Sequence, residues 1–116
     1  MRSQTATRLA VFIDFHKTFA RYALHIRETL LGNVLLIACG GLGISWLEGM
    51  PIGDAIYFAF VTGLTIGYGD INPLTPGGRM LSIAIGMAGL VFTGLMVAVA
   101  TRALADTVKR YEESQR

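Results

Sequence analysis

The chain has 116 residues, of which 53% are hydrophobic and 16% charged, and its formal net charge is +2. A soluble domain carries about 25% charged residues, so this composition fits one only if the excess apolar residues lie in membrane-length segments. Two uncharged segments, 29–47 and 80–101, are long enough to cross a bilayer, because a helical span needs about 20 apolar residues. A third uncharged segment, 55–69, is too short to cross and is typical of a re-entrant or buried segment. These features argue against the soluble enzymes.

The basic residues gather at the two ends of the chain. Nine of the ten Lys and Arg residues lie before the first span or after the second, and the segment between the spans has only Arg79. Because basic residues mark cytoplasmic segments, we expect a multi-pass protein of the cell membrane with both termini in the cytoplasm. The same distribution explains the net charge without a nucleic-acid partner.

Residues 1–28 are predicted to form a cytoplasmic amphipathic helix. Aromatic and apolar residues recur at intervals of three or four, and polar residues mark the opposite side. One interpretation is a helix lying in the headgroup region, which makes the lipid bilayer and its anionic lipids at the cytoplasmic face partners. The other is a cytoplasmic continuation of the first span. The apolar side carries Phe12, Phe15, Phe19, Tyr22 and Ile26, and the polar side carries Asp14, Lys17, Arg21, His25 and Glu28.

The segments that follow are expected to be an outer span over 29–47 and a short helix over 54–64. The outer span contains four glycines, which allow helices to approach closely in lipid, and Trp46 is placed as an interfacial anchor. Asp54 is expected to cap the short helix. The stretch 71–78, with two prolines and two glycines, is predicted to be irregular. An inner helix over 79–101 then continues into a cytoplasmic extension over 102–116.

The segment Thr65-Ile66-Gly67-Tyr68-Gly69-Asp70 lies at membrane depth and is a poor helix. Irregular backbone is tolerated there only when it is buried in protein or lines a water-filled cavity. Alternate glycines suit a backbone that alternates between left- and right-handed conformations. Such a strand directs its carbonyl oxygens to one side, and rings of carbonyls can replace the hydration shell of a monovalent cation.

This hexapeptide resembles the selectivity-filter signature of potassium channels, Thr-x-Gly-Tyr-Gly-Asp. The similarity extends over about residues 23–101 and looks closest to prokaryotic channels with two spans per subunit, in particular the proton-activated kind. It implies an all-α membrane protein, two transmembrane helices with a re-entrant pore helix and filter loop, forming a homotetrameric pore domain over 29–101. It also implies a filter made by residues 65–69, in which the carbonyls of Thr65, Ile66, Gly67 and Tyr68 and the Thr65 hydroxyl coordinate dehydrated K⁺.

The resemblance also implies how the filter is supported. Tyr68 is expected to point away from the pore axis into an aromatic cuff with Tyr57 and Phe58. Val61 stands where the proton-activated relatives carry a glutamate paired to the aspartate behind the filter. Asp70 must therefore find another partner, for which Tyr57 is the candidate, and we expect weaker filter inactivation than in those relatives.

Arg79 begins the predicted inner helix at the wrong pole of its dipole. We therefore expect it to pair with Asp70 or Glu48 as a structural residue.

The inner span carries the candidate gate. Gly89 aligns with the hinge glycine of the resembled family; the alternative, compatible with a hinge, is that Gly86 and Gly89 allow close helix packing. Thr93 is expected to face the cavity, with Val97 and Thr101 nearer the constriction. A hydrophobic constriction gates by dewetting, and Val97 is the candidate for it.

His25 lies in a stretch that resembles the proton-sensing segment of the same relatives. Histidine titrates near neutral pH, and Asp106, Glu112 or Glu113 could be its partners. The alternative is a solvated interfacial histidine.

The function predicted from these features is passive, K⁺-selective conduction, gated at the cytoplasmic inner-helix bundle. A non-selective cation channel and a non-conducting membrane interaction subunit are the alternatives. No catalytic constellation is present in the sequence, so we expect neither enzymatic activity nor a cofactor beyond K⁺ as the permeant ion.

Overall fold

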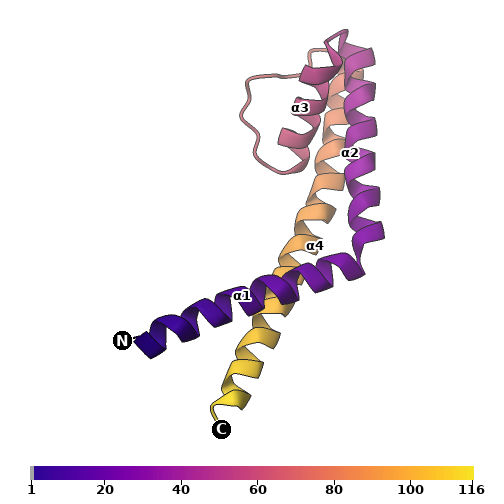
Figure 1. Ribbon diagram of the computed structural model, residues 1–116. Helices are drawn as coiled ribbons and strands as arrows, with labels where there is room; N and C mark the ends of the chain where they lie inside the picture. The colour runs from indigo at the N-terminus through magenta and orange to yellow at the C-terminus, as the bar shows by residue number, and fades with distance from the viewer. Residues whose placement is uncertain (1) are drawn as a thin grey trace. The chain divides into compact units, whose positions relative to one another are not determined.

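The computed structural model describes residues 2–116, with side chains from Ser3 onward, and every regular element in that range is an α-helix (Figure 1). The helices are α1 (Arg2–His25), α2 (Arg27–Glu48), α3 (Ile52–Gly63) and α4 (Pro76–Ser114). Two of these, α2 and α4, are long and apolar enough to cross a membrane, and α3 is a shorter apolar helix. The predicted all-α membrane fold with two spans and a short helix between them is confirmed.

The chain divides into two compact units. Glu28–Gly94 forms one unit, and α1 with Leu95–Arg116 forms the other. The first unit holds α2, α3, residues 64–75 between α3 and α4, and most of the apolar part of α4. The second joins the two ends of the chain.

The helix boundaries differ from the predicted ones by two or three residues at several ends. The helix α3 begins at Ile52 after Pro51, without a side-chain cap, so Asp54 lies in its first turn and the predicted cap is wrong. The helix α4 begins at Pro76 and not at 79. The reason is that the Thr75 hydroxyl accepts a hydrogen bond from the Gly78 N–H at 3.0 Å, and proline suits the first helical position.

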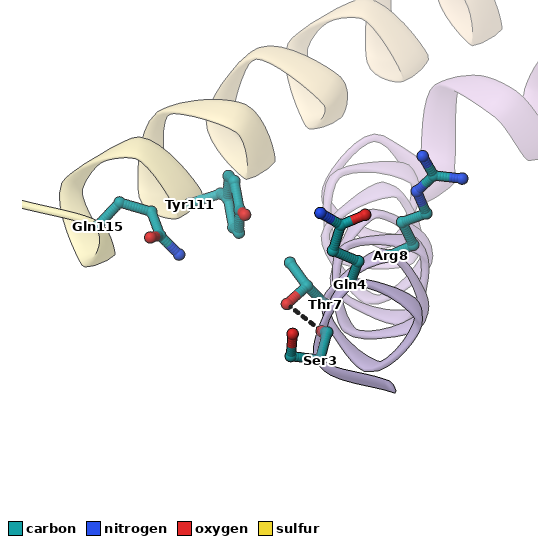
Figure 2. Close-up of a pocket in the computed structure, with 6 residues that line it drawn as sticks. All are labelled: Ser3, Gln4, Thr7, Arg8, Tyr111 and Gln115. Carbon is teal, nitrogen blue, oxygen red and sulfur yellow. Dashed lines mark hydrogen bonds between the residues drawn. The ribbon is translucent and has the colours of Figure 1, made fainter. Parts of the chain in front are cut away.

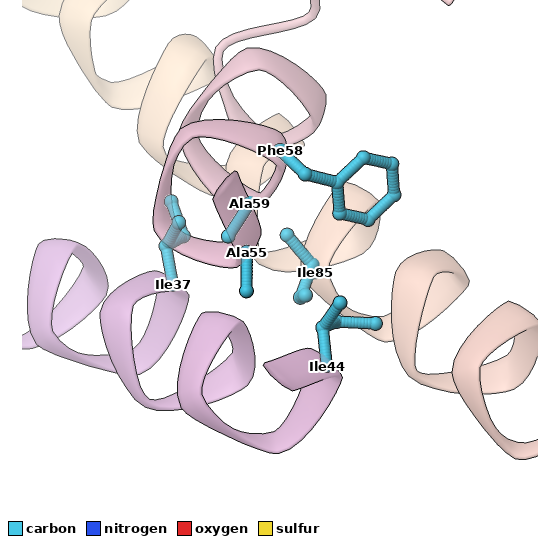
Figure 3. Close-up of a cluster of buried hydrophobic side chains, with 6 residues drawn as sticks. All are labelled: Ile37, Ile44, Ala55, Phe58, Ala59 and Ile85. Atoms are coloured by element: carbon cyan, nitrogen blue, oxygen red, sulfur yellow. The ribbon is translucent and has the colours of Figure 1, made fainter. Parts of the chain in front are cut away.

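A small apolar core holds the first unit together. Its buried side chains come from all three helices, with Ile37 and Ile44 on α2, Ala55, Phe58 and Ala59 on α3, and Ile85 on α4 (Figure 3).

Three glycines of α2 face side chains of the other helices at very short range. A Cβ at Gly40 would lie 2.6 Å from Ile85, one at Gly41 2.9 Å from Ile56, and one at Gly43 2.7 Å from Leu81. These three glycines therefore allow the close helix contacts that we predicted, whereas Gly32 has open space around it.

The outer surfaces of the two long helices are apolar and uncovered. Only 17% of the most apolar 18-residue stretch of each helix is buried. Trp46, near the end of α2, is 83% exposed, as expected of an interfacial anchor. Large exposed apolar side chains continue along both helices, among them Leu31, Leu35, Leu36, Ile83, Met87 and Leu90. Such surfaces fit lipid or further protein rather than water.

In the second unit, α1 is a helix of its own. It ends at His25, and Ile26 lies between it and the start of α2, so the alternative of one continuous helix is wrong. One prediction about its faces also fails. The periodicity predicts that Asp14 and Tyr22 lie on opposite sides of α1. Both contact α4, where Asp14 pairs with Arg110 and Tyr22 with Asp106.

Candidate functional site

The irregular segment 65–70 begins at the C-terminal turn of α3. The N–H groups of Ile66 and Gly67 both donate to the carbonyl oxygen of Val61, at 2.9 and 3.1 Å. The Thr65 N–H donates to the carbonyl of Thr62 at 3.1 Å. These bonds satisfy carbonyls that a helix end leaves without partners. They also fix where the irregular segment begins. The carbonyl of Val61, which the sequence does not single out, therefore holds the start of this segment.

Left-handed backbone alternates along the segment. Thr65, Gly67 and Gly69 have φ values of 60°, 61° and 77°, and the residues between them do not have positive φ. The alternation expected from the glycine spacing is therefore present, and it also includes Thr65. A β-branched residue at positive φ is a true outlier, which costs of order 1–3 kcal/mol and marks functional segments.

The backbone of this segment is accessible in the single chain. Every residue from Leu64 to Asp70 is exposed. Backbone bonds to α3 hold the start of the segment, and side-chain bonds from Tyr57 and Asn72 hold its end. The groups here that could hold a cation are oxygens of the main chain and of the Thr65 hydroxyl. Among the described residues, no group of three or more His, Cys, Asp or Glu side chains could hold a metal ion.

Asp70 ends the segment and is bonded as predicted. Its Oδ2 accepts a hydrogen bond from the Tyr57 hydroxyl at 2.9 Å, in place of the acidic partner that Val61 cannot supply. A second contact was not foreseen. The Asn72 side-chain amide donates to the carbonyl of Gly69 at 2.9 Å, so the carbonyl of Gly69 has a protein partner of its own.

The predicted aromatic cuff is not formed within the protomer. Phe58 is 8% exposed and belongs to the apolar core, while the Tyr68 side chain is 70% exposed. No ring contact between Tyr68 and Tyr57 or Phe58 is found in the described part of the chain. Tyr68 therefore points to a surface that this protomer does not cover.

A carboxylate at the end of α2 holds the segment that leads into α4. Glu48 accepts hydrogen bonds from the N–H groups of Leu74 at 2.8 Å and Thr75 at 3.0 Å, and from the Thr75 hydroxyl at 2.5 Å. A negative charge is favourable at a helix N-terminus. Gly78 leaves room for this carboxylate, since a Cβ there would lie 1.9 Å from the Glu48 Oε1 and the carboxylate would have to move.

The predicted ion pair of Arg79 is wrong. Its Nε donates to the carbonyl of Pro73 at 3.4 Å. Over residues 2–116 the ion pair that forms is between Arg110 and Asp14. Glu48 is already occupied by backbone groups and Asp70 by Tyr57, so neither carboxylate needs Arg79.

Gly89 on α4 lies directly against the end of α3. A Cβ at this position would fall 1.8 Å from the carbonyl oxygen of Gly63 and 2.4 Å from its Cα. This contact supports the packing interpretation of Gly89. Gly86 has no neighbour within 4 Å of an added Cβ, so its predicted packing contact is not made within the protomer. The hinge interpretation of Gly89 stays a prediction.

The three residues assigned to the cavity and constriction recur every four residues along α4. Thr93 is half-buried, Val97 is 59% exposed and Thr101 is exposed. The Thr101 hydroxyl donates to the Val97 carbonyl at 2.8 Å. This spacing places the three residues on one face of the helix, as the pore assignment requires.

His25 is exposed at the end of α1. Its expected partner Asp106 instead accepts a hydrogen bond from Tyr22. Among the described residues, no hydrogen bond or ion pair joins His25 to Glu112 or Glu113 either. None of the three acidic residues expected to pair with His25 is bonded to it in the described residues.

Residues 26–106 match a family described as ion channel, and this range includes both long helices and the irregular segment. The chain belongs to this ion channel family. The matched range begins after α1 has ended. The role of α1 must therefore be argued from its own contacts.

Three similar proteins are named as potassium channels. "Two pore potassium channel c" of Oryza sativa subsp. japonica is 44% identical over 48 residues, which are 41% of this chain and 10% of that protein. "Putative potassium channel protein" of Rhodopseudomonas palustris is 41% identical over 95 residues, covering 72% of this chain and 23% of that protein. "Voltage-gated potassium channel" of Aeropyrum pernix is 41% identical over 44 residues, covering 38% and 15%. The chain thus spans between 10% and 23% of the lengths of these relatives.

Proposed function

We propose that the chain is the pore-forming subunit of a potassium-selective channel of the cell membrane. The carbonyls of Thr65, Ile66, Gly67 and Tyr68, with the Thr65 hydroxyl, take the place of water around a dehydrated K⁺. The observation that carries the proposal is the backbone of alternating hand at Thr65, Gly67 and Gly69, anchored to the end of a short helix between two spans. The relatives' names, which refer to potassium channels, favour K⁺ as the ion.

A homotetramer completes this pore. One strand offers one ladder of oxygens, whereas coordination of a bare cation requires rings contributed by several subunits around an axis. Closed cyclic symmetry is the usual way for identical chains to do this. The exposure of residues 64–70 and of the Tyr68 side chain supports neighbouring subunits on this surface. A neighbour would supply the aromatic cuff that the protomer lacks.

The same proposal places both termini in the cytoplasm, following the basic residues at the chain ends. The helix α1 then lies at the cytoplasmic face of the bilayer. Its exposed apolar residues include Leu9, Phe12, Ile13 and Leu24, and basic residues Arg8, Lys17 and Arg21 accompany them. This combination suits a surface of anionic lipid.

Reconstitution of the purified protein into liposomes tests the proposal. We expect uptake of K⁺ and Rb⁺ that barium blocks, with Na⁺ uptake no greater than in empty liposomes. Equal passage of Na⁺ would favour a non-selective cation channel. The absence of flux of any cation, from tetramers confirmed by size, would favour a non-conducting membrane subunit.

A substitution at Val61 tests the support of the filter. We expect Val61→Glu to give a faster decay of K⁺ current, because a buried carboxyl beside the filter supplies the acidic group that Asp70 lacks here. Val61→Leu keeps the position apolar and serves as the control with an unchanged decay. Recordings from planar bilayers measure the decay, and a slower decay in Val61→Glu would contradict this account.

A further inference from the structure

One face of α1 carries three residues that contact the cytoplasmic end of α4. Asp14, Thr18 and Tyr22 follow one another at intervals of four residues, so they lie along one side of the helix. On α4, Asp106 and Arg110 have the same spacing. We call these five residues the polar seam. All of them belong to the unit formed by the two chain ends.

The polar seam is held by side-chain bonds between the two helices. The Tyr22 hydroxyl donates to Asp106 Oδ2. Arg110 Nη2 donates to the Thr18 hydroxyl at 2.5 Å and lies 3.4 Å from Asp14 Oδ2. Each helix therefore supplies both donors and acceptors to the other.

The burial of the side chains indicates which of these contacts stabilise the pairing of the two helices. The ion pair of Arg110 and Asp14 is open to water, with side chains 44% and 42% exposed, and pairs of this kind contribute little alone. Thr18 is only 3% exposed, so the loss of the bond from Arg110 would leave its hydroxyl without a partner in a buried place. On α4, Val99, Ala103 and Thr107 are buried as well.

Along the two helices, a pocket lies beyond each end of the polar seam. On one side a pocket of about 580 Å³ separates the start of α1 from the end of α4, and the bond drawn there joins Thr7 to Ser3 within α1 (Figure 2). On the other side a groove of about 450 Å³ is lined by Tyr22, His25 and Arg102 with apolar residues of α4. The Arg102 guanidinium lies 5.9 Å from the centre of the Tyr22 ring.

We propose that the polar seam is a restraint on the gate: it ties α1 to the cytoplasmic end of α4, and its bonds break before that end moves to open the pore. This inference rests on the proposed function. A helix end that is bonded to a second helix must either move it through the headgroup region or release it. In this proposal the bonded arrangement belongs to the closed pore, so loss of the polar seam raises conduction.

Removal of one hydroxyl tests the restraint. In liposomes containing the full chain, we expect Tyr22→Phe to raise K⁺ flux by roughly fivefold, the factor that one hydrogen bond of ordinary strength contributes to an equilibrium. Asp106→Ala is expected to match it, and the double variant to add little. Tyr111→Phe is the control, because it removes the same group from an exposed tyrosine of α4 outside the seam. Arg110→Met and Lys109→Met form a second matched pair.

Flux and hydrogen exchange together decide the outcome. We expect amides of α1 to exchange faster in Tyr22→Phe than in the native chain or Tyr111→Phe. If the native channel conducts K⁺ and the seam variants conduct equally or less, the restraint is wrong while the proposed function stands. If neither native nor variant tetramers pass K⁺, the proposed function fails. Unchanged exchange in α1 of Tyr22→Phe would then refute the seam independently.

Discussion

Gly89→Ala is expected to lower the stability of the assembled protein and to abolish K⁺ flux. A Cβ at this position would fall 1.8 Å from the carbonyl oxygen of Gly63. The obstructing atom is backbone and cannot rotate away, so α3 and α4 must separate. Overpacking of this kind costs about 1–3 kcal/mol and occasionally more. Since Gly63 ends α3 two residues before Thr65, the shift reaches the filter directly.

Thermal unfolding of the tetramer in detergent, with Rb⁺ uptake in liposomes, measures this effect. Gly86→Ala is the matched control on the same helix, because no atom lies within 4 Å of its added Cβ in the protomer. The experiment also separates packing from hinge bending at Gly89. A tetramer of native stability that fails only to conduct would favour the hinge, whereas loss of stability together with flux follows from packing.

The membrane architecture was readable from the sequence because its causes are local. An uncharged stretch of sufficient length is a candidate span wherever it occurs, so the sequence alone predicts α2 and α4. The glycines of the irregular segment likewise indicate positive φ directly. The positive φ of Thr65, in contrast, is not indicated by its residue type. Its own preference opposes a φ of 60°, and the bonds of the neighbouring N–H groups to α3 impose it.

Contacts between residues far apart in the chain are what the sequence pattern predicts least well. Asp14 was placed on a polar face because a charge on an amphipathic helix usually faces water. Thr18, one turn further along α1, is buried, and this side of the helix brings Asp14 within 3.4 Å of Arg110, which is far along the chain. Charge alone predicts a carboxylate partner for Arg79, whereas Glu48 is already bonded to backbone N–H groups. The one sign of that arrangement in the sequence is Thr75 before Pro76, a cap followed by proline at the first helical position.

The second large effect is expected from Glu48→Ala. Its carboxylate accepts three hydrogen bonds from Leu74 and Thr75, and hydrogen bonds to a charged acceptor are stronger than those between neutral groups. The affected segment connects the end of the proposed filter to the start of α4. We therefore expect a lower unfolding temperature of the tetramer and a K⁺ current that decays faster than in the native channel.

Glu48→Gln separates the charge from the shape at this position. Its amide oxygen can still accept from Thr75, but its NH₂ group would face the Leu74 N–H, and two donors cannot bond. The expected result is a partial loss of stability and of sustained current, between the native chain and Glu48→Ala. Asp54→Asn removes an acidic group from the first turn of α3, where no side chain caps the helix, and serves as the control. Because Thr75 shares these bonds, Thr75→Val should cost much less in Glu48→Ala than in the native chain. Full additivity of the two substitutions would show that Glu48 stabilises this region in some other way.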